Sequence, residues 1–344
     1  MNASYKKYTL DFKRPSGTSR GVLTQKETWF IQLEDNGQVG YGECGLLRGL
    51  SIDDRSDYEE KLAWTCKNIE RGLDVLYSEL KEFPSIQFGL EMALLSLQAE
   101  DPFVLFPSAF TRGEEGIPIN GLVWMGEPDF MQEQISSKIK AGFNCIKMKI
   151  GAIDFEAEME LLKGIRAQFS PEEITLRVDA NGAFTSKNAL SKLKRLATLG
   201  LHSIEQPIKQ NQIDEMQRLC KQSTLPIALD EELIGIFNKA AKKRLLSHIN
   251  PQYIILKPSL IGGFRGSEEW IAIAEELNIG WWITSALESN IGLNAIAQFT
   301  HTKKTRIPQG LGTGSLFTNN VSSPLKINNG QLFYHAETLW SFQF

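Results

Sequence analysis

The sequence predicts an α/β fold in which a (β/α)8-type barrel follows a smaller α+β unit. Two observations lead to this fold class. From about residue 109 onward, short apolar runs alternate with amphipathic helical segments seven or eight times in roughly 200 residues, and such an alternation is typical of a parallel sheet. Polar residues also end the successive apolar runs at regular intervals, as expected at the mouth of a closed barrel.

A doubly wound open sheet is the competing architecture. Its nucleotide-binding forms carry a glycine-rich turn, G-x-G-x-x-G or G-x-x-x-x-G-K-[S/T], where a strand leads into a helix. No such turn opens a predicted helix of this sequence. A closed barrel is therefore favoured.

Residues 1–108 are predicted to form the α+β unit. The segment 27–44 contains two strand patterns on either side of Asn36 and Gly37, and an Asn-Gly pair between such patterns is a strong hairpin signal. From about residue 55 to 100 the apolar spacing becomes helical, and the segment PSIQFGLEMALLSLQAED begins with a Pro-Ser helix start.

The barrel itself is predicted over residues 109–319, with its first three helices near 127–141, 154–168 and 186–199. The final segment, 320–344, falls outside the strand–helix alternation. We expect this segment to return to the first unit and complete it.

Composition and charge limit the partners of the chain. A formal net charge of -4 without a basic run argues against nucleic acid. No apolar run reaches the roughly 18 residues of a membrane span, and the N-terminal residues lack the apolar core of a secretory signal. The 4 cysteines form no C-x-x-C pair, as expected for free thiols in a reducing compartment. A cytoplasmic protein is expected, and a homo-oligomer is compatible with the sequence.

Polar residues end successive predicted strands at intervals of 25 to 30 residues, close to the length of one βα unit. Because the C-terminal ends of barrel strands meet at one mouth, we expect these side chains to surround a single active site. In chain order they are Lys149, Asp179, Glu205, Asp230, Lys257 and Ser285.

Asp179, Glu205 and Asp230, hereafter the carboxylate cluster, fall on consecutive predicted strands. Unpaired carboxylates so arranged would repel one another, and a divalent cation would remove the conflict. An all-oxygen set suits Mg²⁺, or Mn²⁺ in its place. Each residue alone has an ordinary explanation as a turn former, a helix N-cap or an acidic first helical turn, but their matched positions favour a metal site.

The segment FNCIKMKIG places Lys147 and Lys149 on the same face of a predicted strand, among apolar neighbours. The positive charge of Lys147 is expected to help keep Lys149 deprotonated, so that Lys149 could act as a base. Lys257 is expected on the opposite side of the ring. A solvated edge strand with snorkelling lysines is the alternative, but a central barrel strand has no edge. A metal between two lysines suits removal of a proton next to a carboxylate.

The segments 285–292 (SALESNIG) and 310–314 (GLGTG) follow the last two predicted strands. Their small residues predict backbone N–H groups that are free to bind an anion. Ordinary loops are the alternative.

The segments KMK, DANGAF, EQP, LDE and LKPSLIGG resemble, in this order, the motifs of the muconate-lactonizing subgroup of the enolase superfamily, in which a Lys base works with Mg²⁺. TSALESNIGLNAIAQFT and QGLGTGSLFTNN resemble the o-succinylbenzoate synthases, the dehydratases (lyases) of menaquinone synthesis. The resemblance covers nearly the whole chain. It implies a modified TIM barrel with an α+β capping domain built from the N-terminal region and the C-terminal tail.

The resemblance also implies roles for the lysines. Lys149 would remove the α-proton of a small carboxylate substrate and then assist departure of its hydroxyl on the same face. Lys257 would stay charged and stabilise the enediolate, with a cation–π contact to the forming ring as a further contribution. Lys147 would support Lys149, and the carboxylate cluster would hold Mg²⁺.

Further residues are implied to bind the substrate. Asn181 follows the first metal ligand as in the family pattern, and Ser285 and Gly310 match positions that bind the carboxylate arm of the substrate. Ser19 belongs to a loop near 18–21 that would close over the site. GYGECGLLRGLS is similar to a capping-domain segment of the family, but its CGLLRG part lacks the usual proline.

A racemase or epimerase of the same superfamily is the main alternative, because two lysines across a substrate could move a proton in either direction. Dipeptide epimerases carry Asp-x-Asp at the eighth strand, where this chain has GLGTG. N-succinylamino acid racemization stays open, since that substrate also has a succinyl arm. A noncatalytic barrel is disfavoured because every expected catalytic residue type is present. A metal hydrolase is disfavoured because the 4 histidines show no metal-binding spacing.

Overall fold

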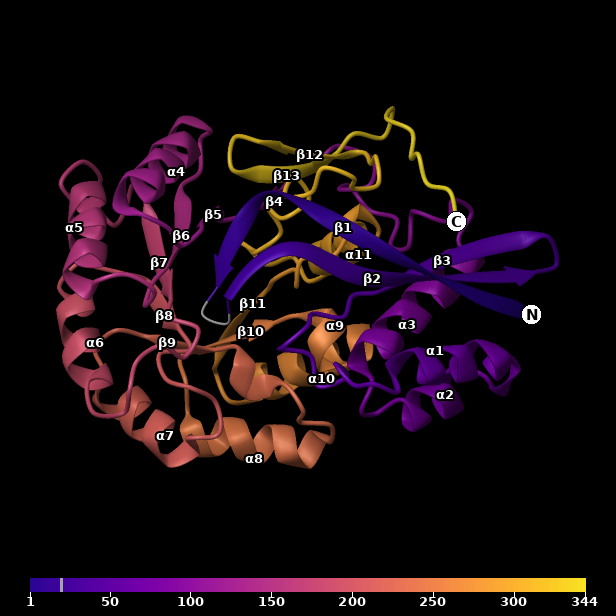
Figure 1. Ribbon diagram of the computed structural model, residues 1–344, viewed down its shortest axis with the longest axis horizontal. Coiled ribbons are helices and arrows are strands. Elements are labelled where there is room, and N and C mark those ends of the chain that lie inside the picture. Colours follow the sequence, from indigo (N-terminus) through magenta and orange to yellow (C-terminus); the bar gives the residue numbers. More distant parts are fainter. Residues whose placement is uncertain (19–20) are drawn as a thin grey trace.

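The structure is a computed structural model that describes residues 1–18 and 21–344, without the side chains of residues 17 and 18. Figure 1 shows a barrel of parallel strands surrounded by helices, beside a smaller unit of antiparallel strands and helices. This architecture agrees with the predicted fold class.

The first unit contains an antiparallel sheet in the order β1-β2-β3, made by β1 (Asn2–Thr18), β2 (Gly21–Asp35) and β3 (Gln38–Cys44). Asn36 and Gly37 connect β2 to β3 with φ angles of 49° and 81°, as a type I′ turn requires. The predicted hairpin is therefore confirmed. The helices of this unit are α1 (Tyr58–Lys67), the 3-10 helix η1 (Ile69–Arg71), α2 (Leu73–Glu79) and α3 (Pro84–Gln98).

Helix α3 packs directly on strand β3, and glycines make this close approach possible. A Cβ atom on Gly42 would overlap the carbonyl oxygen of Gly89, and one on Gly40 would overlap the backbone of Ala93 and Leu97. Because backbone atoms cannot rotate away as a side chain can, these positions accept no larger residue without moving the helix.

We predict opposite effects for two Gly→Ala replacements. Gly42→Ala should destabilise the protein by about 1–3 kcal/mol, because its new methyl group meets fixed backbone. Gly164→Ala, in a helix with nothing within 4 Å of the new Cβ, should stabilise it by about 0.5–1 kcal/mol. Urea unfolding of the two variants measures both values, and equal effects would contradict this account of the β3–α3 contact.

The barrel contains a sheet of parallel strands whose spatial order follows the chain order, from β5 to β11. The strands are β5 (Gly121–Val123), β6 (Cys145–Lys149), β7 (Thr175–Asp179), β8 (Ser203–Glu205), β9 (Ile227–Leu229), β10 (Tyr253–Leu256) and β11 (Gly280–Ile283). The helices outside them are α4 (Pro128–Lys140), α5 (Phe155–Arg166), α6 (Ala189–Ala197), α7 (Ile213–Gln222), α8 (Lys239–Ile249), α9 (Pro258–Ile261), α10 (Gly263–Glu276) and α11 (Asn290–Thr302). A 3-10 helix, η2 (Glu231–Leu233), follows β9.

The eighth strand is reduced to isolated bridges at Gln309 and Gly310. Gly310 pairs with Thr284 and Gln309 pairs with Ile119, both in parallel. The Gly310 amide donates to the Ile283 carbonyl at 2.9 Å, and the Gln309 amide donates to the Pro118 carbonyl at 2.8 Å. The ring is therefore closed between β11 and the segment that leads into β5. No helix follows the bridges in the described residues, since GLGTG lacks an apolar helical pattern.

The C-terminal segment contacts both parts of the molecule. β13 (Gln331–Tyr334) pairs with β12 (Leu325–Asn328) and with β4 (Ile117–Pro118), the short strand before the barrel. Farther along, the ring of Phe342 lies 5.0 Å from that of Phe30 in the sheet of the first unit. The boundaries 1–108, 109–319 and 320–344 stay predictions.

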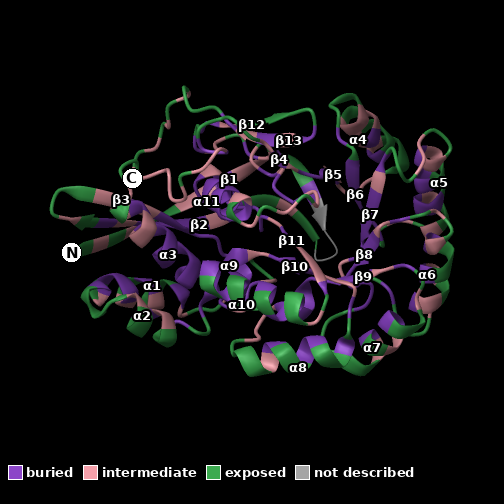
Figure 2. Cartoon of the chain, turned by 180° about the vertical axis from the view of Figure 1, so that it is seen from behind, coloured by how far each residue is buried: buried purple, intermediate pink, exposed green. Residues whose placement is uncertain are grey.

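Two buried glutamates of the first unit cap barrel helices. Glu43 accepts hydrogen bonds from the amides of Ser289 and Gly292 at the start of α11, both at 2.8 Å. Glu91 accepts from the amide of Phe264 at 2.5 Å, in the first turn of α10. Carboxylates are favourable at helix N-termini. These bonds help to fix the first unit over the barrel, where Figure 2 shows buried residues at the junction.

The Glu91 contact predicts a pH dependence of stability. Burial raises the pKa of Glu91 to about 8, against about 4.3 in an unfolded chain. The folded protein therefore binds this proton more tightly than the unfolded chain does. The part of the free energy of unfolding that comes from this proton is fully present below about pH 4.3 and is lost as pH rises through about 8. Between these pH values, the free energy of unfolding of Glu91→Gln should fall by a few kcal/mol less than that of the native chain. Thermal unfolding at several pH values tests this, and parallel curves for the two proteins would contradict it.

Candidate active site

Strand β6 carries the two lysines of FNCIKMKIG into the interior of the barrel. All residues of β6 are buried; Ile146 and Met148 belong to the main hydrophobic core. Lys147 and Lys149 are 7% and 9% exposed. The alternative of an edge strand with lysines in water is therefore wrong, because hydrogen-bonded strands flank β6 on both sides.

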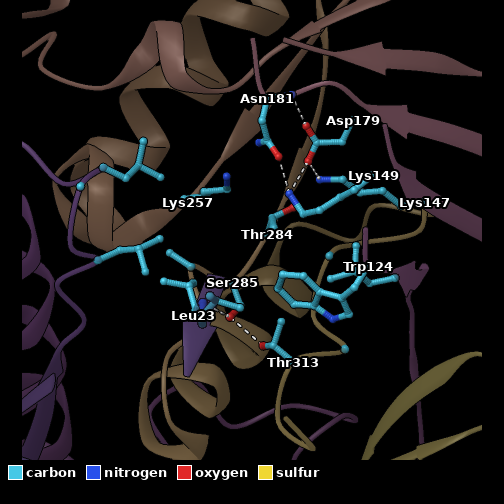
Figure 3. Close-up of a pocket in the computed structure, with 18 of the residues that line it drawn as sticks. Leu23, Trp124, Lys147, Lys149, Asp179, Asn181, Lys257, Thr284, Ser285 and Thr313 are labelled. Atoms are coloured by element: carbon cyan, nitrogen blue, oxygen red, sulfur yellow. Dashed lines mark hydrogen bonds and ion pairs between the residues drawn. The ribbon is translucent and has the colours of Figure 1, made fainter. Parts of the chain in front are cut away.

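The carboxylate cluster meets these lysines because the parallel strands are in register. Lys149 on β6 lies opposite Asp179 on β7, which in turn lies opposite Glu205 on β8. Asp230 directly follows β9, and Lys257 directly follows β10. The structure thus brings together the residues that the spacing in the sequence placed at one barrel mouth. Figure 3 shows Lys257 across the cavity from Lys149 and Asp179.

The lysines and the carboxylate cluster form ion pairs. Lys147 Nζ lies 3.0 Å from Asp179 Oδ2 and 2.5 Å from Glu205 Oε2. Lys149 Nζ lies 3.0 Å from the same oxygen of Asp179, and Lys257 pairs with Asp230. The 2 ammonium groups of β6 therefore share one acceptor atom.

The shared environment shifts the charge states of this group. Burial alone would lower the pKa of Lys147, but Asp179 and Glu205 raise it well above its usual range. Burial would likewise raise the pKa of Asp179, yet Lys147 and Lys149 hold it below its usual range. Lys147 thus stays a cation beside Lys149. That this charge keeps Lys149 deprotonated stays a prediction.

The carboxylate cluster has the donor chemistry of a site for a hard cation. Its members are 1–2% exposed, and Glu205 Oε1 has no hydrogen-bond partner in the described part of the chain. Within residues 1–18 and 21–344, no three His, Cys, Asp or Glu side chains are already arranged to hold a metal ion, and the carboxylate cluster is paired with lysines. The oxygen donors of the carboxylate cluster, including the unpartnered Glu205 Oε1, fit Mg²⁺. Binding of the ion would require the paired lysine ammonium groups to move away from these oxygens.

Asn181 positions Lys149. Its side-chain Oδ1 atom accepts a hydrogen bond from Lys149 Nζ at 2.6 Å, and its backbone amide donates to Asp179 Oδ1 at 3.0 Å. The side-chain amide also donates to Glu231 Oε1 at 3.1 Å. The φ angle of Asn181 is 43°, a conformation that asparagine tolerates better than most residues.

Ser285 and Gly310 lie at the same cavity, but their backbone amides are used by the fold. The Ser285 amide donates to the Gly310 carbonyl at 3.0 Å. The next amide, that of Ala286, donates to Glu288 Oε2 at 2.7 Å. The expectation of free N–H groups at the start of segment 285–292 is therefore wrong, since the Gly310 carbonyl accepts from the first amide and buried Glu288 accepts from the second. The Ser285 hydroxyl donates to Glu288 as well, at 2.7 Å.

Trp124 lines the cavity but was not among the site residues predicted from the spacing of polar residues. Lys149 Nζ lies 5.9 Å from the centre of the Trp124 ring. The backbone amide of Trp124 donates a hydrogen bond to Gln134 Oε1 on α4 at 2.9 Å. Trp124 follows β5 and precedes Lys149 by one βα interval. Extending the regular spacing backward by one unit would have found it.

The cavity has a volume of about 200 Å³ and lies between the barrel mouth and the first unit. The barrel contributes the lysines and Asp179, whereas the first unit contributes Leu23, Leu47 and Gly49. The segment CGLLRG, whose conformation could not be predicted because it lacks the usual proline, therefore borders the cavity. Ser19 lies outside the described residues.

Comparison with known proteins agrees with this geometry. Residues 2–97 match the family described as MenC, N-terminal domain, and residues 131–336 match Enolase C-terminal domain-like. An o-succinylbenzoate synthase of Desulfotalea psychrophila is 49% identical, over 96% of this chain and 98% of that protein. The chain belongs to the o-succinylbenzoate synthase family of the enolase superfamily.

Solved structures of the superfamily have the same fold. MenC from Desulfotalea psychrophila superposes with a TM-score of 0.86, at 46% identity, over 97% of this chain and 99% of that one. A dipeptide epimerase from Enterococcus faecalis, complexed with Mg and a dipeptide, gives a TM-score of 0.84 over 96% of both chains. Its identity is only 20%, so it supports the fold alone. The predicted fold and family resemblance are confirmed.

The described residues of this o-succinylbenzoate synthase family member include no helix that is long and apolar enough to cross a membrane. This agrees with the absence of a long apolar run in the sequence.

Proposed function

We propose that the chain is an Mg²⁺-dependent o-succinylbenzoate synthase. It dehydrates 2-succinyl-6-hydroxy-2,4-cyclohexadiene-1-carboxylate to 2-succinylbenzoate in menaquinone synthesis. The observation that carries this proposal is that two lysines, buried Lys149 and Lys257 with a side chain 13% exposed, line one cavity beside the carboxylate cluster, in a chain 49% identical to a synthase.

Lys149 is the proposed base. Neutral Lys149 takes the proton from the carbon next to the ring carboxylate, and the electron pair of that C–H bond forms an enediolate. The resulting ammonium is held by Asn181 at 2.6 Å and Asp179 at 3.0 Å. It then returns the proton to the leaving hydroxyl on the same face. The C–O bond breaks, the ring becomes aromatic, and one water leaves.

The surrounding charges stabilise the enediolate. Asp230 and Glu205 raise the pKa of Lys257 although burial opposes them, so Lys257 stays a cation across the cavity. A bound Mg²⁺, held by the carboxylate cluster, would supply further positive charge at the ring carboxylate. Lys147 keeps a fixed positive charge beside Lys149. Burial of these groups strengthens each electrostatic interaction.

Racemization of an N-succinylamino acid is the second candidate. It is favoured by one observation, that Lys149 and Lys257 both line the same cavity and could exchange a proton with opposite faces of a substrate. Dipeptide epimerization is less well supported, because segment 310–314 has no carboxylate to hold an amino group.

One assay separates these functions. The purified chain, given Mg²⁺ and the cyclohexadiene substrate, should form the aromatic product, which is followed by its ultraviolet absorbance. A parallel sample with a succinylated amino acid in heavy water reports deuterium exchange at Cα. Deuterium exchange without dehydration would replace the proposed function with racemization. The absence of both reactions would refute both functions.

A further inference from the structure

Residues 205–208, the segment EQPI, lie between the ends of strands β7 and β9. The Gly182 amide, beyond the end of β7, donates to the Gln206 carbonyl at 2.7 Å. On the other side, the Gln206 amide donates to the carbonyl of Ala228 in β9 at 2.9 Å. Figure 1 shows β7, β8 and β9 side by side. Gln206 therefore connects the strand ends that carry the carboxylate cluster.

The side chain of Gln206 is fully buried and contacts the turn that begins with Asp230. Its Oε1 atom accepts hydrogen bonds from the backbone amides of Asp230 at 3.2 Å and Glu232 at 3.4 Å. Its Nε2 atom donates to Glu232 Oε2 and to the Ile208 carbonyl, both at 3.1 Å. These partners fix the orientation of the side-chain amide, because donors face its oxygen and acceptors face its nitrogen.

Glu232 is the partner of Gln206 within this turn. The carboxylate of Glu232 is buried, and its Oε1 atom accepts a further hydrogen bond from the backbone amide of Asn211 at 2.8 Å. Asp230, which begins the turn, pairs instead with Lys257. The turn thus presents one carboxylate to the lysine of the cavity and uses another to anchor itself to Gln206.

Gln206 adopts a left-handed backbone conformation, with a φ angle of 38°. Residues with a Cβ atom rarely adopt this conformation, and it persists where the surrounding contacts hold it. A glycine would meet the backbone requirement of this position more easily, but it could make no side-chain hydrogen bond. The glutamine is therefore explained by the bonds that its side chain makes to the turn after β9.

We propose that Gln206 is a positioning residue, which holds Asp230 where the whole carboxylate cluster can bind one cation. The inference rests on the proposed function, which places Mg²⁺ at this cluster. Mg²⁺ requires near-ideal octahedral geometry, so a displacement of the turn after β9 would weaken binding of the ion. Residues that orient metal ligands typically change metal affinity about 10- to 100-fold.

Calorimetry of Mg²⁺ binding to chelator-treated protein tests the proposal, and the heat that disappears in Asp179→Asn identifies the site. Gln206→Met keeps the length of the side chain but removes its hydrogen bonds, so Mg²⁺ should bind about 10- to 100-fold more weakly. Gln206→Gly, which suits the backbone conformation, should show the same loss. Gln168→Met, which removes a surface amide that donates to the Gly164 carbonyl, is the matched control and should keep the native affinity.

Thermal unfolding without Mg²⁺ shows whether each Gln206 variant folds. Native Mg²⁺ affinity in either folded variant, whatever its midpoint of unfolding, would show that Gln206 has only a structural role and would overturn the proposal. The Mg²⁺ concentration for half-maximal dehydration should rise by the same factor as the dissociation constant. If the native chain bound Mg²⁺ at this site but did not dehydrate the substrate, the proposed function alone would fail, and the affinities would still decide the role of Gln206.

Discussion

Replacement of Lys149 by alanine should lower kcat for dehydration by about 10²–10⁴-fold, because general-base catalysis contributes this much. Lys257→Ala should lose about 10²–10³-fold through the missing charge across the cavity. Lys149→Ala is not expected to unfold the protein, since Lys147 also pairs with Asp179. Lys257→Ala leaves Asp230 without its ion-pair partner, so this variant should be less stable but still folded. Deuterium exchange at the substrate α-carbon should vanish in Lys149→Ala and should be slowed in Lys257→Ala.

Two variants sharpen this test. Lys149→Arg keeps the positive charge near Asp179, but a guanidinium does not lose its proton in proteins, so this variant should be as inactive as alanine. Lys163→Ala, which removes a surface lysine paired with Glu160, is the control and should retain native turnover. Substantial activity in Lys149→Arg would show that Lys149 contributes charge rather than a base. Thermal unfolding of each variant verifies the fold.

The side chains of the candidate active site could be grouped from the sequence because a barrel converts sequence spacing into spatial proximity. Polar residues one βα unit apart reach the same mouth, and the register of β6, β7 and β8 places Lys149, Asp179 and Glu205 side by side. The Asn36-Gly37 hairpin was equally predictable, since it depends only on local backbone preferences.

Other features depend on contacts between distant residues, which local patterns do not contain. Within segment 285–292, the Ser289 amide donates to Glu43, which lies 246 residues away in the sequence. The pairing of Lys147 with Glu205 also needs the positions of both strands at atomic detail. The reduced eighth strand lacks the apolar run by which a strand is recognised. Long-range polar contacts therefore mark where sequence reasoning stops.

Mg²⁺ should stabilise the Lys147→Met variant more than the native chain. Lys147 compensates Asp179 and Glu205 at 3.0 and 2.5 Å, and removing one partner of a buried ion pair costs about 3–5 kcal/mol. A divalent cation bound by the carboxylate cluster would replace the lost charge. The increase in the midpoint of thermal unfolding on adding Mg²⁺ to chelator-treated protein should thus be larger in Lys147→Met.

The opposite change should be seen when a carboxylate is removed. Asp179→Asn loses a charged ligand, so its Mg²⁺-dependent shift should be smaller than that of the native chain, for which saturation at about 100 times Kd corresponds to about 2.7 kcal/mol. Asp214→Asn, at a carboxylate that is 92% exposed, should keep the native shift. This order of shifts requires lysine and cation to compete for the same oxygens. Equal shifts in all four proteins would place the metal elsewhere.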